Sequence, residues 1–371
     1  MLASLARVVA VTLKELIQLR RDRLTFGMIL GIPVMQLLLF GYAINADPKR
    51  LPTALLSRDP GQIERSIAGA LERSGYFQVV ARVSGEREAE RLVAEGEVAF
   101  VVTIPDGFSR DLLKGERPQL LVEADATDPA ATSNAVAALS QLPRSALLHD
   151  LPGLVSPPAF DVLVHRRYNP EGLTAYNIVP GLLGVILTMT MILMTSLAVT
   201  RETERGTMEN LLAMPVKPGE VMLGKVLPYI AIGYVQVAVV LVAARFLFQV
   251  PMLGSIGLLS LALLAFLGAN LAVGLTFSAV ARNQLQAMQM TFFFFLPSML
   301  LSGFMFPFRG MPGWAQAIGE VLPLTHFLRI VRGILLKGNG WIEIWPEVWP
   351  LLAFAGVAWT IAILRYRRTL D

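Results

Sequence analysis

Residues 201–215 read RETERGTMENLLAMP, and this charged stretch separates two long apolar runs at roughly 173–199 and 226–249. Both runs are too long and too apolar for ordinary core helices, so each is predicted to cross a membrane. The stretch between them must then lie at one membrane face. There the eight ionisable groups from Arg201 to Lys225 can stay hydrated.

The charged stretch has the pattern of a short amphipathic helix. Met208, Leu211 and Leu212 fall at i, i+3 and i+4 on one side, and the charged residues lie largely elsewhere. Pro215 and Pro218 then end the helix. A soluble partner could bind such a helix and so move the transmembrane helices connected to it. On the charge pattern alone, a solvated connecting loop is the preferred interpretation.

The composition indicates a polytopic membrane protein. The chain has 371 residues, of which 54% are hydrophobic and 16% are charged, with a mean hydropathy of +0.57. Residues 47–171 hold 18 of the 28 acidic and 14 of the 32 Lys and Arg residues, so a soluble domain is inserted there. The absence of cysteine excludes disulfides and thiolate sites. The net charge of +4 comes with basic residues at span ends, which indicates membrane orientation and no nucleic acid partner.

The predicted fold class is an all-α membrane bundle of six transmembrane helices with an inserted extracytoplasmic α/β domain and an amphipathic N-terminal interfacial helix. Residues 1–23 form the interfacial helix, which ends in a basic cluster. The α/β domain is expected at 47–171, and the five-helix region at 172–371. The six spans are expected at 24–46, 173–199, 226–249, 257–281, 286–306 and 346–364.

Charge at the span ends sets the predicted orientation. With both termini inside, the cytoplasmic segments hold 13 Lys and Arg residues, and the short outer segments and span ends hold five. The excess of basic residues marks the cytoplasmic side. We therefore expect a multi-pass protein of the bacterial inner (cytoplasmic) membrane with both termini cytoplasmic.

The inserted domain alternates short strands and helices, which predicts an α/β unit of about four strands. Asp59, Asp106 and Asp128 fall where helix N-caps are expected. Residues 152–158 read as a proline-rich linker. The strands are predicted at 53–57, 77–83, 98–104 and 120–123, and the helices at 60–74, 86–95, 106–114 and 129–148.

Residues 307–345, between the last two spans, are too short for a domain and too apolar for a free loop. They contain two short helical patterns broken by prolines and glycines. Trp314, Trp341, Trp345 and Trp349 are spaced like an interfacial belt. We predict re-entrant or surface-lying helices that cap the outer end of a pathway.

No motif for chemistry is complete. Gly219, Gly224 and Lys225 have the spacing of a phosphate-binding loop, but Val226 stands where Ser or Thr would hold magnesium. The three histidines have no ligand spacing, and no catalytic arrangement appears. We expect no enzyme activity, no catalytic residue, and no cofactor or metal held by this chain.

The spans are expected to lack carboxylates, and the five predicted between residues 24 and 306 contain no Asp or Glu. A transporter driven by protons or sodium usually needs such relays. Energy for any transport should therefore come from a partner. Gln36, Gln236 and Asn270 are the few polar groups at depth. Helix–helix hydrogen bonding is the preferred role for each, and lining a pathway is the alternative.

Four segments in order resemble the ABC-2 type transporter permeases, over essentially the whole chain. The charged stretch, followed by Gly224-Lys225, looks like their cytoplasmic loop. The outer region is similar from Leu301-Ser302-Gly303-x-x-Phe306-Pro307 to Lys337-Gly338. The basic leader also fits, as does Ile104-Pro105-x-Gly107-Phe108, which is typical of the multidrug-type export branch with a large periplasmic domain.

The resemblance implies a coupling helix at 201–214 that docks on a separate ABC ATPase subunit, which binds ATP and Mg²⁺. A second permease copy, identical or paralogous, would complete the pathway, and the outer domain would meet a periplasmic adaptor protein. The coupling residues would be Arg201, Glu202, Glu204, Arg205, Met208, Glu209, Leu211 and Leu212. The pathway or outer-gate candidates are Gln236, Asn270, Leu301, Ser302, Gly303, Phe306 and Pro307.

The function that the resemblance implies is efflux of hydrophobic or amphipathic, drug-like compounds. Two alternatives stay open: a lipid or polysaccharide exporter of the same fold, and a membrane-anchored sensor or scaffold. Lipid and polysaccharide permeases usually lack a large outer domain, which counts against the first. No residue identifies the cargo.

Overall fold

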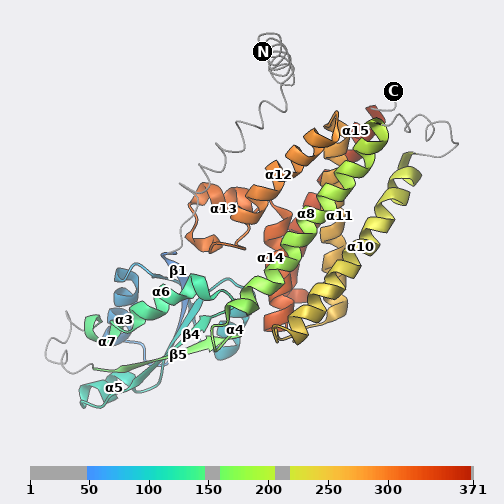
Figure 1. The fold of residues 1–371 in the computed structure, drawn as a ribbon. Coiled ribbons are helices and arrows are strands. Elements are labelled where there is room, and N and C mark those ends of the chain that lie inside the picture. Colours follow the sequence, from blue (N-terminus) through green and yellow to red (C-terminus); the bar gives the residue numbers. More distant parts are fainter. Residues whose placement is uncertain (1–47, 147–158, 205–217, 369–371) are drawn as a thin grey trace, which may run out of the picture.

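The computed structural model describes residues 48–146, 159–204 and 218–368. An α/β sheet region lies at one end of a bundle of long helices (Figure 1). The predicted interfacial helix at 1–23 and first span at 24–46 lie outside the described residues.

The sheet has five strands in the order β2-β1-β3-β4-β5. β3 pairs antiparallel with β4, and the other neighbouring strands pair in parallel. The apolar residues of β1 and β3 run almost without interruption, as expected of strands that are covered on both faces. The strands are β1 (Leu51–Ser57), β2 (Phe77–Val83), β3 (Phe100–Ile104), β4 (Gln119–Asp125) and β5 (Asp161–Arg167).

Helices cover both faces of the sheet. On one face, α3 (Gln62–Arg73), α5 (Phe108–Leu113), α6 (Pro129–Leu139) and α7 (Leu142–Ser145) contribute to the larger apolar core. On the other face, α4 (Glu86–Ala94) packs Ala89, Leu92 and Val93 against Leu56 and Val101. The sheet is therefore the middle of three layers.

Two details of the predicted α/β unit are wrong. The sheet has a fifth strand, β5, which follows the predicted linker at 152–158 and was not predicted. The helix predicted at 129–148 is interrupted between α6 and α7, because Pro143 cannot continue a helix and instead lies in the first turn of α7.

Of the three predicted N-caps, only Asp128 caps its own helix. Its side chain accepts a hydrogen bond from the Ala131 amide at the start of α6. Asp59 instead accepts from the Ser109 amide at 2.6 Å, so it caps α5 from another part of the chain. Asp106 is not at the cap of α5, which is Gly107.

Within the described residues, the bundle contains four helices that are long and apolar enough to cross a membrane by length and composition. They are α8 (Thr174–Glu204), α10 (Pro218–Phe246), α11 (Ile256–Val280) and α15 (Trp341–Arg368). Together with the separate sheet region, they confirm the fold class in its coarser form. α12 (Gln284–Leu301) occupies most of the predicted fifth span and is not among the four, so six spans stay a prediction.

The core of the bundle lies between α8, α11, α14 (Pro323–Arg332) and α15. Phe266 of α11 and Phe327 of α14 are both fully buried and stack with ring centroids 4.0 Å apart. In contrast, α10 leaves Val235 and Val239 each 64% exposed. This apolar face needs lipid or another helix as its neighbour.

Residues 307–345 fold into short helices that join the bundle. η3 (Phe308–Gly310) and α13 (Gly313–Gly319) follow α12, and η4 (Gly333–Lys337) follows α14. Eight of the ten residues of α14 are buried, so this helix is part of the core. The placement of the segment relative to a membrane stays a prediction.

Candidate functional site

Three of the predicted coupling residues, Arg201, Glu202 and Glu204, lie in the last turn of α8. The side chains of Arg201 and Glu204 are exposed, at the end of the helix that points away from the sheet (Figure 1). The other five, Arg205, Met208, Glu209, Leu211 and Leu212, lie outside the described residues.

The Glu204 carboxylate connects the end of α8 to the start of α12. It accepts a hydrogen bond from the Gln284 backbone amide at 2.8 Å and another from the Gln284 side chain. A carboxylate at a helix N-terminus is stabilised by the unpaired amides there. These hydrogen bonds lower the pKa of Glu204. Glu204 thus has a structural partner that competes with its predicted contact to an ATPase.

Gln236 and Asn270 differ in their surroundings. Gln236 accepts a hydrogen bond from the Thr190 hydroxyl at 3.0 Å, which links α10 to α8. Asn270 is fully buried, and its amide donates to the Phe266 carbonyl of its own helix at 2.9 Å. Its side-chain oxygen has no hydrogen-bond partner within the described part of the chain. The preferred helix-linking role therefore fits Gln236 better than Asn270.

The outer-gate candidates lie at the turn that ends α12. Leu301 is buried against Met311 and Leu322, and Pro307 is buried nearby. Ser302 donates to the Met299 carbonyl at 3.2 Å. The Gly303 φ angle of +82° lies in the left-handed region, where glycine is favoured.

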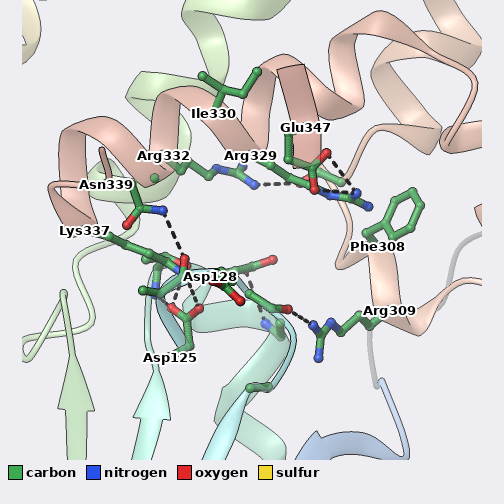
Figure 2. Close-up of a pocket in the computed structure, with 18 of the residues that line it drawn as sticks. Asp125, Asp128, Phe308, Arg309, Arg329, Ile330, Arg332, Lys337, Asn339 and Glu347 are labelled. Atoms are coloured by element: carbon green, nitrogen blue, oxygen red, sulfur yellow. Dashed lines mark hydrogen bonds and ion pairs between the residues drawn. The ribbon is translucent and has the colours of Figure 1, made fainter. Parts of the chain in front are cut away.

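Ser302 and Gly303 also line a cavity of about 410 Å³ between the sheet region and the bundle. Figure 2 shows Asp125 and Asp128 on the sheet side of this cavity and Arg329 and Arg332 reaching from α14 on the other. Leu301, Phe306 and Pro307 are not part of its lining. Two of the predicted gate residues, Ser302 and Gly303, therefore lie beside a cluster of charges that comes from distant parts of the sequence.

Lys337 links the two sides of the cavity by a buried ion pair. Its ammonium group lies 2.6 Å from a carboxylate oxygen of Asp125, and the two side chains are only 8% and 13% exposed. The same ammonium donates to the Val93 carbonyl at 2.9 Å, and Asn339 donates to the Ala94 carbonyl at 3.0 Å. Both carbonyls lie at the C-terminal end of α4, where positive charge is favoured.

A second group of charges joins α14 to α15. Arg329 binds Glu320 at 2.6 Å and Glu347 at 3.1 Å. His326 lies 2.6 Å from Glu347 through Nδ1 and 2.7 Å from the Glu320 carbonyl through Nε2. Glu347 lies inside the predicted sixth span, so the expectation that the spans lack carboxylates is wrong there. It remains at the end nearest the sheet, paired with two cationic side chains.

The surroundings of His326 favour its charged form. A backbone carbonyl only accepts, and so does an ionised carboxylate, so both ring nitrogens must donate. Burial opposes protonation, and so does the Arg329 charge. The hydrogen bonds to Glu347 and Glu320 and the Glu347 charge outweigh both and raise the pKa of His326 above its ordinary value.

We expect the protein to lose stability as the pH rises through the pKa of folded His326. Because the folded pKa is raised, the stabilisation is complete below the unfolded pKa of about 6.5 and disappears above the folded one. The measurement is the melting temperature in detergent from about pH 5.5 to about pH 9. The advantage of the wild type over His326→Gln should shrink with rising pH, and a constant difference would contradict the assignment.

The charged cavity could not be located from the sequence. From the sequence, Arg309, Arg329, Arg332 and Lys337 are outer basic residues, and the last three also belong to the segment that resembles the ABC-2 permeases. The available signal was an excess of basic residues in the outer segment 307–345. Nothing in the sequence indicates that Asp125 lies across the cavity from Lys337. Among the described residues, no group of three His, Asp or Glu side chains is arranged to hold a metal ion.

Comparisons with known proteins identify the family. The model described as "ABC-2 family transporter protein" matches residues 23–364. Three relatives from Escherichia coli (strain K12) match most of the chain. "Probable multidrug ABC transporter permease YbhR" is 27% identical, with 96% of this chain and 96% of the relative covered. "Probable multidrug ABC transporter permease YbhS" is 30% identical, with 98% of each covered.

The third relative, "Inner membrane transport permease YhhJ", is 30% identical, with 86% of each chain covered. The family match and all three relatives extend over the apolar helices as well as the sheet region. The resemblance noted in the sequence is confirmed: the chain belongs to the ABC-2 family of transporter proteins.

Proposed function

We propose that this chain is the membrane subunit of an exporter that moves hydrophobic or amphipathic, drug-like compounds out of the cytoplasm or the inner leaflet. A separate ABC ATPase subunit binds ATP and Mg²⁺, and a second permease copy, identical or paralogous, completes the pathway. The multidrug names of two relatives support this cargo class. A periplasmic adaptor that contacts the α/β domain is part of the same proposal.

The observation that carries the proposal is the separation of the two ends of α8. Its first turns contact the sheet region, where the Asn177 amide donates to the Thr127 carbonyl at 3.1 Å. The helix has 31 residues, so its length is about 46 Å at a rise of 1.5 Å per residue. Arg201 and Glu204 therefore lie at the far end of the bundle from the sheet (Figure 1).

Basic residues gather at this far end, which supports the proposed orientation. Arg282 lies just before α12, whose first residue contacts Glu204, and α15 ends in the Arg365–Arg368 stretch. Under the positive-inside rule, that end faces the cytoplasm and the sheet region faces the outside. Segment 201–214 is then accessible to a cytoplasmic ATPase.

We expect Glu209→Lys to weaken binding of the partner ATPase by about tenfold, because one charge reversal at a docking surface is worth on the order of 1.4 kcal/mol. The measurement is co-purification of a candidate ABC ATPase subunit with the permease, together with the ATPase rate of the complex in proteoliposomes. Efflux of a fluorescent amphipathic compound should fall in parallel.

Two matched variants make this test specific. Glu88→Lys makes the same charge change on an exposed position of α4 in the sheet region and should leave coupling intact. Glu204→Gln removes the carboxylate charge that accepts the hydrogen bond from the Gln284 amide. It shows how much of any loss of coupling comes from this contact between α8 and α12. If Glu209→Lys retains full coupling, the docking role of 201–214 is wrong. If the ATPase couples normally but no compound moves, the exporter class must be reconsidered.

A further inference from the structure

Two guanidinium groups at the cavity, those of Arg309 and Arg332, form no ion pair with a carboxylate of the described residues. Arg329 and Lys337 both form ion pairs. Among the described residues, no carboxylate oxygen lies within the 4.0 Å ion-pair distance of Arg309 or Arg332. Arg309 Nη1 and Arg332 Nε are buried and have no hydrogen-bond partner in the same part of the chain. Uncompensated buried charge is costly and calls for an explanation.

The partners that these two arginines do have are neutral. Arg332 donates to the Gly303 carbonyl at 3.2 Å and to the Asn177 side-chain oxygen at 2.7 Å. Arg309 donates to the Gly96 carbonyl across the cavity. Such acceptors orient a guanidinium group but leave its charge in place. Both arginines are therefore held by the protein with net positive charge at the cavity wall.

Asp128 does not offset this charge fully. It also lines the cavity, and its attraction to Arg332 favours the ionised form. Burial outweighs that attraction and raises the pKa of Asp128. Burial also lowers the pKa of Arg332, against the attraction of Asp128 and Asp125. Burial and the Arg329 charge together lower the pKa of Arg309, against the attraction of Asp125. The positive charge of Arg309 and Arg332 is thus not fully compensated, which favours the binding of an additional negative charge at the cavity.

The surroundings of the cavity are amphipathic. Phe308 and Ile330 contribute apolar lining, and Gln316 of α13 faces the cavity. The outer side of α13 exposes apolar residues, with Trp314 at 46% and Ile318 at 47%. Exposed Trp beside polar groups is typical of a membrane interface. An acyl chain could lie on this face while a polar headgroup enters the cavity.

We propose that this cavity binds an oxyanion, a phosphate or carboxylate group of an amphipathic molecule, between Arg309 and Arg332. The volume of about 410 Å³ is in the usual range for small-molecule sites. Guanidinium groups bind phosphate and carboxylate with paired hydrogen bonds. The site joins the sheet region to the turn at Gly303, and it does not depend on the cargo or on the partner ATPase.

The test measures ligand-induced thermal shifts of the delipidated full-length protein in a neutral detergent. The probes are inorganic phosphate, phosphatidylglycerol and diacylglycerol, with ionic strength held constant. We expect saturable stabilisation by phosphatidylglycerol and none by diacylglycerol, which has the chains but no phosphate. A shift with inorganic phosphate as well assigns the site to free anions, and a shift with the lipid alone assigns it to a membrane headgroup. No shift with either phosphate compound overturns the proposal.

Variants tie the shift to the two arginines. Arg309→Gln and Arg332→Gln should each weaken phosphatidylglycerol binding at least tenfold, and Arg309→Lys should retain part of it. Arg309 lies in the short η3 segment and not in the core helix α14, so Arg309→Gln remains informative if Arg332→Gln fails to fold. The control is Arg245→Gln at the outer end of α10, which does not line the cavity. Equal shifts in Arg309→Gln and the control would also overturn the proposal.

Discussion

Lys337→Met is expected to lower the free energy of unfolding by about 3–5 kcal/mol, because it leaves a buried carboxylate without its partner. The Lys337–Asp125 pair is 2.6 Å long, and both side chains are almost fully buried. Methionine fills a similar volume but provides no charge and no donor for the Val93 carbonyl. The measurement is denaturant unfolding in detergent, with limited proteolysis to report whether the sheet region separates from the bundle.

Two comparisons separate the lost charge from the lost volume. Arg58→Met breaks an ion pair with Glu86 that is 2.7 Å long, but its side chains are 55% and 70% exposed. Its loss should cost no more than about 1 kcal/mol. The double variant Lys337→Met/Asp125→Asn removes both buried charges and should recover much of the stability. The asparagine side-chain oxygen can still accept the two hydrogen bonds from Thr127, so that local contact is kept. A double variant no better than the single one would contradict the charge argument.

Much of the fold could be predicted from local patterns. The strand at Phe77–Val83 was predicted with the bounds that the structure has, and four of the apolar runs are long helices. These elements depend on periodicity and on apolar length, which a single stretch of sequence contains. The family resemblance rested on motifs that are also local.

Elements that depend on distant contacts could not be predicted in this way. β5 is an edge strand whose side chains alternate between half-buried and exposed, with none of them fully buried, and it needs β4 as its partner. Asp59 caps a helix that begins about fifty residues later. Both are stabilised by residues that are far away in the sequence, so no window around them contains the signal.

The candidate site shows the same division. The gate motif at Leu301–Pro307 and the basic residues near 330 can each be recognised in the sequence. The contact of Lys337 with Asp125 cannot, because the two residues are 212 positions apart. Glu347 was overlooked because it opens an otherwise apolar run, and its role is visible only beside His326 and Arg329. The charges that link the sheet region to the bundle are therefore a tertiary feature.

Gly274→Leu is expected to separate α8 from α11 and to destabilise the bundle by about 3 kcal/mol or more, at the upper end of overpacking costs. A Cβ atom at Gly274 would lie 2.8 Å from the Ile192 carbonyl oxygen and 2.9 Å from Thr195 Cβ. The carbonyl belongs to the backbone of α8, so no side-chain rotation can relieve the contact. Small residues allow this close approach between membrane helices.

Gly356→Leu is the matched control, because a Cβ atom there meets no neighbour within 4 Å and the residue is exposed on α15. Both glycines lie inside long helices, so the change in helix propensity is the same and cancels in the comparison. The melting temperature and the monodisperse fraction in detergent should fall sharply for Gly274→Leu and stay near the wild type for Gly356→Leu. Gly274→Ala should lie between them, because it adds only the Cβ atom. If the two leucine variants behave alike, the loss comes from leucine in a helix and not from the contact between α8 and α11.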